Sequence, residues 1–245
     1  MPQPLTFPTG AIVYPNEFHA GLAIARCREY TEIRGFQIHL ACAQKGQRMR
    51  PMDVLEEDIA ATGYSIDAAE WTHARRHMSE INVRAGSKIL SQARIADQYL
   101  FVASGVAASE QTWETGATSI ARFFERGQIC SNFTSAWNQQ YAADDLLALT
   151  DVTGVSFSDT IMRGAYLEGG TLGKYLRVKA MQAHLFTKEV LCAKTHITIE
   201  PRYAFLEHFH DEVLGRVQQK DIARFLGVTP QGLCRFLRRR KCAAD

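Results

Sequence analysis

The feature of this sequence that most restricts its fold is a stretch near the C-terminus, QQKDIARFLGVTPQGLCRFLRRR (218–240). Ala223 is small enough to let a second helix cross closely, and Gly227, four residues later, can adopt the positive φ of a tight turn. Leu233 and Phe236 follow Ala223 by ten and thirteen residues and share the inner face of a second predicted helix. This combination within one short segment is typical of a helix-turn-helix.

The outward face of the second predicted helix carries side chains suited to DNA. Thr229 is placed to cap this helix, whose N-terminal amides and positive dipole end favour a phosphate. In the major groove Gln can pair with adenine and Arg with guanine, which gives Gln231 and Arg235 roles in reading bases. The predicted DNA-binding set is Gln219, Lys220, Thr229, Pro230, Gln231, Cys234, Arg235, Arg238, Arg239 and Arg240. The alternative is a helical hairpin that ends in a solvated basic tail.

Charge is distributed unevenly along the chain, although its formal net charge is only +2 at pH 7. Residues 216–241 hold eight Lys or Arg and one Asp, whereas the rest of the chain holds 20 Lys or Arg and 25 Asp or Glu. Positive charge gathered at one end points to an anionic partner for that end alone.

The composition is that of an ordinary globular chain, with 46% hydrophobic and 22% charged residues among 245. Its longest apolar runs are too short to cross a membrane. The N-terminus lacks the basic segment and apolar core of a secretory signal. The six cysteines are scattered without a CxxC pair, which argues against a disulfide framework or a zinc site. We therefore expect a cytoplasmic protein with reduced thiols.

Residues 81–158 form a section of short β-like runs separated by glycines. Several short strands with regular turn signals predict an antiparallel sandwich or roll of the jelly-roll type, and with the flanking helices an α+β fold. A cupin-like enzyme or small-molecule-binding protein with a basic tail is the alternative. The section contains no His, however, and Cys130 has no His near it in sequence, so we predict neither a metal site nor a catalytic group.

A long helix is predicted after the β section because apolar residues recur at alternating intervals of four and three. The row consists of Leu172, Leu176, Lys179, Ala183, Phe186, Val190 and Ala193, with Lys179 as its one polar member. Two interpretations remain open from the spacing. The helix packs on its own β section, or it pairs with its twin in a dimer through Leu172, Leu176, Ala183, Phe186 and Val190.

Further helices are predicted on either side of the β section. Residues 53–63 predict a short helix that ends at Gly63, after a polar linker broken by Pro51. Residues 65–78 predict a second, with Ser65 as its N-cap. A helix is also expected from Thr198, with Pro201 in its first turn. A helical run is also expected over about 19–43, against the tendency of a glycine, β-branched residues and several aromatics within it.

From Met52 onward the chain resembles a transcription regulator of the Crp/Fnr family. The motif-bearing stretches are RYAFLEHFHDEVLGRVQQKDIARFLGVTPQGLCRFLRR (202–239) and FFERGQICSNFTSAWNQQYAADDLLALTDVTGVSFS (123–158). The resemblance implies a cyclic-nucleotide-binding-like β-roll over 52–168, a dimerisation helix over 169–197 and a helix-turn-helix domain over 198–245. It also implies a homodimer on a palindromic operator in double-stranded DNA, with RNA polymerase as a further partner and no membrane association.

The departures from the family pattern concern its cofactors. Cyclic-nucleotide binders carry a Gly-Glu pair and, about ten residues later, an Arg for the phosphate, whereas Gly127 is followed here by Gln128. No Arg or Lys occurs between Arg126 and Arg163, and a buried phosphate without a cation is costly. We therefore predict no cyclic AMP binding. With only Cys27 and Cys42 near the N-terminus, we predict no iron–sulfur cluster either.

Three further expectations concern smaller groups of residues. Residues 1–51 have no counterpart in the resemblance and are either an accessory extension or upstream sequence before a true start at Met52 or Met49. In the β section Phe123, Phe124, Phe133 and Trp137 are expected in the core rather than around a ligand. The histidines at 208 and 210 are expected on the surface.

Overall fold

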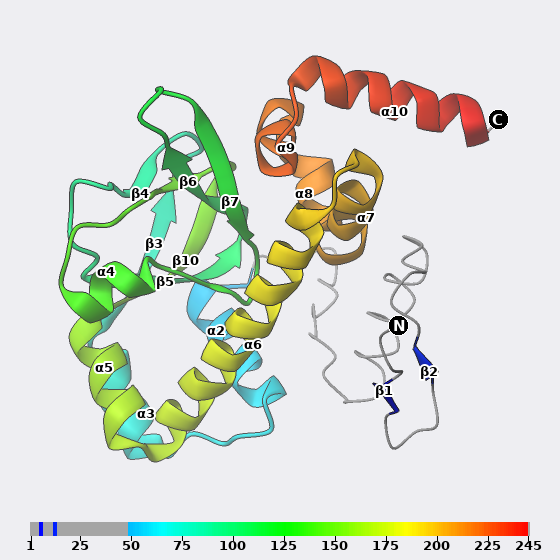
Figure 1. Ribbon diagram of the computed structural model, residues 1–245. Helices are drawn as coiled ribbons and strands as arrows, with labels where there is room; N and C mark the ends of the chain where they lie inside the picture. The colour runs from blue at the N-terminus through cyan, green and yellow to red at the C-terminus, as the bar shows by residue number, and fades with distance from the viewer. Residues whose placement is uncertain (1–4, 7–11, 14–48, 245) are drawn as a thin grey trace. The chain divides into compact units, whose positions relative to one another are not determined.

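The computed structural model describes residues 5–6, 12–13 and 49–244 (Figure 1). Strands β1 (Leu5–Thr6) and β2 (Ile12–Val13) pair antiparallel in a unit of their own. All elements from residue 49 onward belong to a second unit. The helical run expected over 19–43 lies outside the described residues.

Two four-stranded antiparallel sheets form the β-roll of the second unit. One sheet has the order β3-β10-β5-β8 and the other β4-β9-β6-β7. The strands are β3 (Met78–Val83), β4 (Lys88–Leu90), β5 (Gln98–Ser104), β6 (Ala107–Thr112), β7 (Thr118–Phe124), β8 (Ile129–Cys130), β9 (Asp145–Ala148) and β10 (Val152–Ser158). The predicted α+β fold with an antiparallel roll is confirmed.

The turn between β5 and β6 shows why one of the punctuating glycines is needed. Gly105 has a φ of 90°, and a Cβ built there would lie 2.1 Å from the backbone oxygen of Asp151. A larger residue would therefore suffer both backbone strain and a collision with the strand connection opposite. The short turn lets β5 pass directly into β6 of the other sheet.

Four helices flank the roll before the long helix. They are α2 (Pro51–Ala61), α3 (Ala68–Arg75), α4 (Phe133–Asn138) and α5 (Asp159–Glu168). Pro51 is the first residue of α2 and not a break before it, because a helix does not use the N–H that proline lacks at that position. The N-cap of α3 is Asp67 and not Ser65, since the Asp67 carboxylate accepts from the amides of Ala69 and Glu70.

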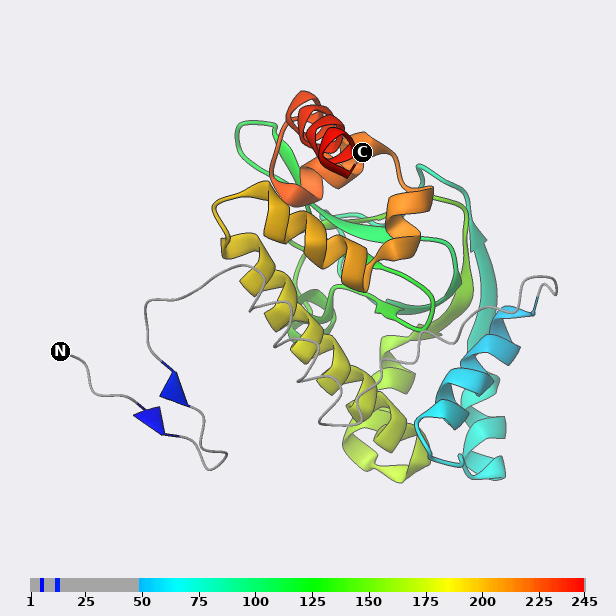
Figure 2. The same ribbon diagram turned by 90° about the vertical axis from the view of Figure 1, so that its right-hand side faces the viewer.

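Helix α6 (Gly170–Thr195) runs diagonally beside the sheets (Figure 2). Its start is capped from α3, because the Glu70 carboxylate accepts from the amides of Thr171 and Leu172, each at 2.9 Å. Gly170 has a φ of 72°, and a Cβ there would stand 2.5 Å from a Glu70 oxygen. Local helix signals do not predict this contact, because Glu70 and the start of α6 are about a hundred residues apart in the sequence.

Replacing Glu70 with Ala should lower the free energy of unfolding by about 1 kcal/mol, the usual value of a lost helix cap. Two helix-terminal amides would lose their acceptor, while the packing of α6 would be retained. Glu70→Gln keeps one acceptor oxygen and is expected to lose less. Urea unfolding of the three proteins measures the effect, and equal midpoints would contradict this role for Glu70.

The row predicted as one dimer interface faces the protein's own β-roll instead. Leu172, Leu176, Phe186 and Val190 are each at most 7% exposed within the single chain, and Ala183 is half-buried. Lys179, the polar member, pairs with Asp58 of α2 at 2.9 Å. The burial of the row favours the intrachain interpretation, because the β-roll, α2 and α7 supply partners for these side chains.

Two of the four expected core aromatics lie at the surface. Phe123 and Phe124 are buried, but Phe133 is 42% exposed and Trp137 is 50% exposed. Both surface rings belong to α4, a single short helix that turns one apolar side outward. The Trp137 ring is covered by the Arg163 guanidinium at 4.8 Å, which compensates part of its exposure.

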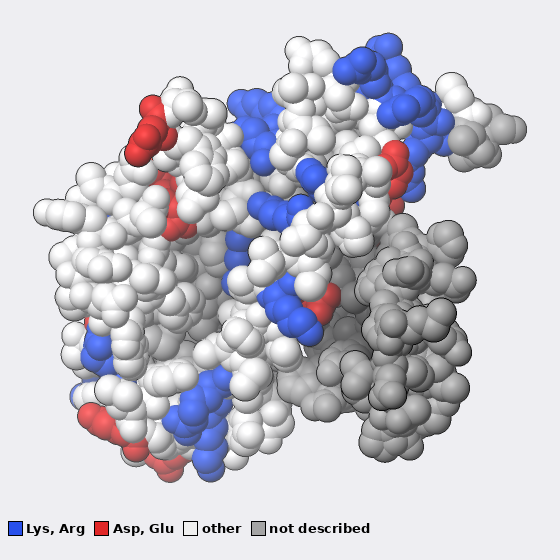
Figure 3. All heavy atoms as spheres, viewed as in Figure 1, with Lys and Arg blue, Asp and Glu red and all other residues white. Residues whose placement is uncertain are grey.

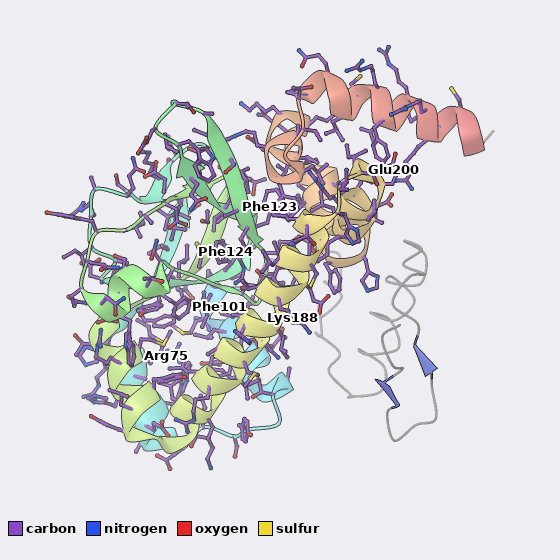
Figure 4. All side chains as sticks on the ribbon, viewed as in Figure 1. Arg75, Phe101, Phe123, Phe124, Lys188 and Glu200 are labelled. Atoms are coloured by element: carbon purple, nitrogen blue, oxygen red, sulfur yellow. The ribbon has the colours of Figure 1, made fainter. Side chains whose placement is uncertain are left out.

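Four helices complete the chain. They are α7 (Ile199–Phe209), α8 (Asp211–Arg216), α9 (Gln219–Leu226) and α10 (Pro230–Ala244). Their core is continuous with the second sheet, since Phe225 of α9 lies 4.9 Å from the Phe123 ring of β7. Figure 4 labels Phe123 and Phe124 on this strand, beside α6. The α7–α10 unit therefore rests on the roll rather than standing apart from it.

Candidate nucleic-acid interface

The turn between α9 and α10 has the geometry that the sequence predicts. Gly227 has a φ of 68°, and its amide donates to the carbonyl of Ala223. The Thr229 hydroxyl accepts from the Gly232 amide at 3.0 Å, which caps the start of α10. Leu233 and Phe236 point inward with Ala223, and none of the three is more than 3% exposed.

The predicted outward side chains lie at the surface of α9 and α10. Lys and Arg gather along α10 (Figure 3). Within the part of the chain that the structure describes, Arg235, Arg238 and Arg239 have no ion-pair partner. Cys234 is half-buried, and the exposed members of the predicted set are Gln219, Lys220, Thr229, Pro230, Gln231, Arg235, Arg238, Arg239 and Arg240.

Arg240 is tied to the protein more than the other arginines of α10. Its guanidinium pairs with Glu207 of α7 at 2.9 Å and lies over the Tyr203 and Phe236 rings. A phosphate would have to compete with these partners. The structure therefore assigns Arg240 to the packing of α10 on α7, a role that sequence spacing alone does not reveal.

Arg224 was not among the predicted residues, yet it is the most connected cation of α9. It contacts the Glu110 carboxylate of β6, pairs with Asp221 at 3.0 Å and donates to the Thr118 hydroxyl of β7 at 2.7 Å. Burial raises the pKa of the Asp221 carboxyl and lowers the pKa of the Arg224 guanidinium. Desolvation thus disfavours the charged form of both groups. Each charge therefore relies on the other for its stabilisation.

His210, expected at the surface, is fully buried between α7 and α8. Its Nδ1 meets the Glu125 carboxylate, which follows β7. The imidazole also lies edge-on to Phe123 and Phe186, 5.6 and 5.2 Å between ring centroids. The HFH segment therefore belongs to the contact between α7–α10 and the roll, where the neighbouring apolar rings come from distant parts of the sequence.

Lys194, near the end of α6, spans the same contact. Its amine donates to the Ile120 carbonyl of β7 at 2.7 Å and lies 4.5 Å from the centre of the Phe225 ring. Burial, with a smaller contribution from the Arg202 charge, lowers the pKa of Lys194 to about 8. The charged amine is consequently less favourable in the folded than in the unfolded chain.

A pH titration of stability should reveal this amine. Because the folded pKa lies below the ordinary value of 10.5, the folded state gains stability as pH rises from about 8 toward 10.5. The difference in unfolding free energy between Lys194→Met and wild type should thus shift in favour of wild type by on the order of 1 kcal/mol from pH 7 to 9.5, allowing for solvent screening. Denaturant unfolding at both pH values measures it, and an unchanged difference would refute the assignment.

An acidic group of the β-roll, Asp144, lies beside the start of α4. The Asp144 carboxylate accepts from the Ser109 hydroxyl and from the Asn132 amide, while Asn132 also caps α4. Arg122 of β7 is a largely buried cation that lies just before residues 127–162, the stretch without Lys or Arg. Its guanidinium lies 4.9 and 5.2 Å from the centres of the Phe124 and Phe186 rings, and burial lowers its pKa to about 10.

Two absences in the described part of the chain bear on other classes of protein. Among residues 5–6, 12–13 and 49–244, no group of three or more His, Cys, Asp or Glu is arranged to hold a metal ion. No helix in the described part of the chain is long and apolar enough to span a membrane.

Comparison with known proteins reveals a likeness in structure only. No protein-family model and no curated protein matches the sequence. FixK2 from Bradyrhizobium japonicum is 16% identical over 68% of this chain and 86% of its own, with a TM-score of 0.58. The c-di-GMP-responsive global regulator CLP of Xanthomonas campestris is 13% identical over 73% and 93%, with a TM-score of 0.57.

A third similar structure is a Crp/Fnr-family regulator from Eubacterium rectale. It is 14% identical over 73% of this chain and 85% of its own, with a TM-score of 0.57. At such identities the likeness establishes the fold and not the activity. The chain thus has a Crp/Fnr-like fold, as its sequence motifs predict.

Proposed function

We propose that the protein is a sequence-specific DNA-binding transcription regulator. The observation that carries this proposal is the exposed basic face of α10, where Arg235, Arg238 and Arg239 have no ion-pair partner among the described residues. This helix begins just after the left-handed Gly227 turn. A helix presented in this way fits the major groove, and α9 would cross the phosphate backbone beside it. The similarity of the fold to a Crp/Fnr-family transcriptional regulator and to the global regulator CLP supports the same class.

Each exposed side chain has a role that follows from its chemistry. Gln231 and Arg235, one turn apart on α10, would pair with base edges. Lys220, Arg238 and Arg239 would contact phosphates, which adds affinity without sequence information. Gln219 would donate to a phosphate beside Lys220, and Thr229 with Pro230 would set the start of α10. The half-buried Cys234 leaves room for α10 to approach the groove.

Homodimerisation is proposed through the face of α6 that turns away from the β-roll. Met181 is 54% exposed and Leu185 is 42% exposed, and they lie in one row with the half-buried Val178 and the exposed Cys192. Their intervals of three, four and seven residues place them opposite the buried row. We call Val178, Met181, Leu185 and Cys192 the outer row. Lys188 is its polar member.

The β-roll is proposed not to bind cyclic AMP. Residues 127–162 hold no Lys or Arg for a buried phosphate, and the Asp144 carboxylate, which accepts from the Asn132 amide, would repel one where water is partly excluded. The one largely buried cation described nearby, Arg122, already stacks on two aromatic rings. We propose no cofactor for the protein, RNA polymerase as its further partner and the cytoplasm as its location.

Selection of binding sequences from a pool of random duplexes tests the proposed function. The purified protein should enrich an inverted repeat whose half-site centres lie about one helical turn apart, roughly 10 base pairs. Enrichment of a single half-site would retain DNA reading but contradict the homodimer on its operator. A pool without any enriched sequence after repeated selection would overturn the assignment as a sequence-specific regulator.

A further inference from the structure

Helix α9, the first helix of the helix-turn-helix, is bonded to the β6–β7 hairpin near its turn. We call helices α7–α10 the reading unit. Arg224 joins three elements, since it contacts Glu110 on β6 and Thr118 on β7 and pairs with Asp221 on its own helix. The side chains of Arg224, Glu110 and Asp221 are 24%, 14% and 9% exposed. At this degree of burial, separating the partners would leave a charge without compensation, which is costly. The ion pair therefore favours the one arrangement of α9 and the hairpin in which it can form.

An apolar contact lies beside this ion pair. Phe225, the neighbour of Arg224 on α9, packs on Phe123 of β7. The Lys194 amine of α6 also lies over the Phe225 ring, 4.5 Å from its centre, and donates to the carbonyl of Ile120. Helix α9 is thus held by the hairpin and by the end of α6 together.

The connection between α6 and α7 is held as well. Arg202 donates to the carbonyl of His196 at 2.8 Å, in the connection itself, and to the carbonyl of Leu226 at 2.7 Å, at the end of α9. One guanidinium therefore ties the segment that would serve as a hinge to the turn before α10. With Arg224 and the buried His210–Glu125 contact on the roll side, the reading unit has three polar attachments.

These attachments do not use the residues assigned to DNA. Gln219, Lys220, Gln231 and Arg235 remain exposed while Arg224 is engaged. Docking on the hairpin and reading of bases are therefore compatible in one conformation. The angle of α10 relative to α6 follows from contacts within a single chain.

We propose that Arg224 is a positioning residue: by bonding α9 to Glu110 and Thr118 it fixes the angle of the reading helix, and thereby the half-site spacing that the dimer accepts. The proposal rests on the proposed function. In a dimer joined along α6, the distance between the two reading helices depends on this angle in each chain. Without the Arg224 bonds, the reading unit would be held on the roll by the His210–Glu125 contact and by Phe225 on Phe123, so that α9 and α10 could tilt and the dimer would accept several spacings.

Affinity for three duplexes tests the proposal: a single half-site, the selected inverted repeat, and the same repeat with two base pairs added between the half-sites. Wild type should prefer the selected repeat over the lengthened one by more than about tenfold, because both reading helices must fit at once. Arg224→Gln should keep half-site affinity within about twofold and lose most of that preference. Glu110→Gln, which keeps the shape of the side chain, should act in the same direction if Arg224→Gln folds poorly.

Arg75→Gln is the matched control, since it removes one arginine from an exposed pair with Glu56 on α2 and α3. It should retain the spacing preference of wild type. An unchanged preference in both Arg224→Gln and Glu110→Gln would overturn the proposal. Tighter binding of either variant to the selected repeat would also overturn it, because docking would then oppose DNA binding. A wild type that binds no duplex would instead refute the proposed function itself.

Discussion

Replacing Leu185 with Glu should leave the protein monomeric and weaken its binding to a two-half-site operator by about a hundredfold or more. Leu185 lies near the middle of the outer row of α6 and is 42% exposed in the single chain. In a parallel pair of helices the two glutamates would face each other across the interface. Repulsion between their negative charges would then replace an apolar contact. Each monomer would then hold the operator by one half-site only.

Sedimentation velocity and anisotropy on the selected repeat measure the two effects. Leu191→Glu is the matched control, because Leu191 is 64% exposed on the same helix but lies outside the outer row. It should remain dimeric and bind normally. A dimeric Leu185→Glu protein with full operator affinity would contradict the proposed interface.

Mild oxidation is a second test of the same interface. Cys192 belongs to the outer row and is exposed in the single chain. A parallel two-fold pairing would bring it near its twin, within reach of a disulfide. We therefore expect a crosslinked dimer in a Cys242→Ser background, and its loss when Leu185→Glu is added.

Replacing Arg235 with Ala should cost roughly 1–3 kcal/mol on the selected operator and relax its preference at one base pair in each half-site. The Arg235 side chain is exposed on α10 and has no ion-pair partner in the described residues, so its removal leaves the fold intact. Loss of a bidentate contact to guanine would account for both effects.

Arg239→Ala is the control for charge alone. It should weaken binding to all duplexes to a similar extent, because a phosphate contact carries no sequence information. Affinities for the operator and its single-base variants distinguish the two cases. An Arg235→Ala protein that keeps the base preference of wild type would remove Arg235 from the reading residues.

The sequence was most informative where structure depends on neighbouring residues. The turn at Gly227 and the cap at Thr229 follow from residue types within one short segment, and so does the exposure of Gln231 and Arg235. The β-roll could likewise be predicted from short apolar runs with glycines between them. Local spacing is sufficient for such features because the backbone itself requires those residues.

Contacts between distant segments could not be predicted in this way. Helix α6 has two apolar rows, the predicted heptad row and the outer row. Periodicity does not say which of the two the β-roll covers. The answer depends on Asp58, which receives Lys179 from a helix far away in sequence. His210 and Arg224 were missed for the same reason, since Glu125 and Glu110 are their partners on or beside the second sheet.

The most direct test of the central claim is fluorescence anisotropy of the full-length protein on the selected duplex and on a scrambled duplex across a salt series. Three phosphate-binding cations in each chain, Lys220, Arg238 and Arg239, give six in a dimer and predict a slope of log affinity against log salt of about −5. The selected duplex should also bind at least about a thousandfold more tightly at physiological salt. Equal affinity for both duplexes, lost together as salt rises, would show a basic end without sequence recognition and would contradict the account.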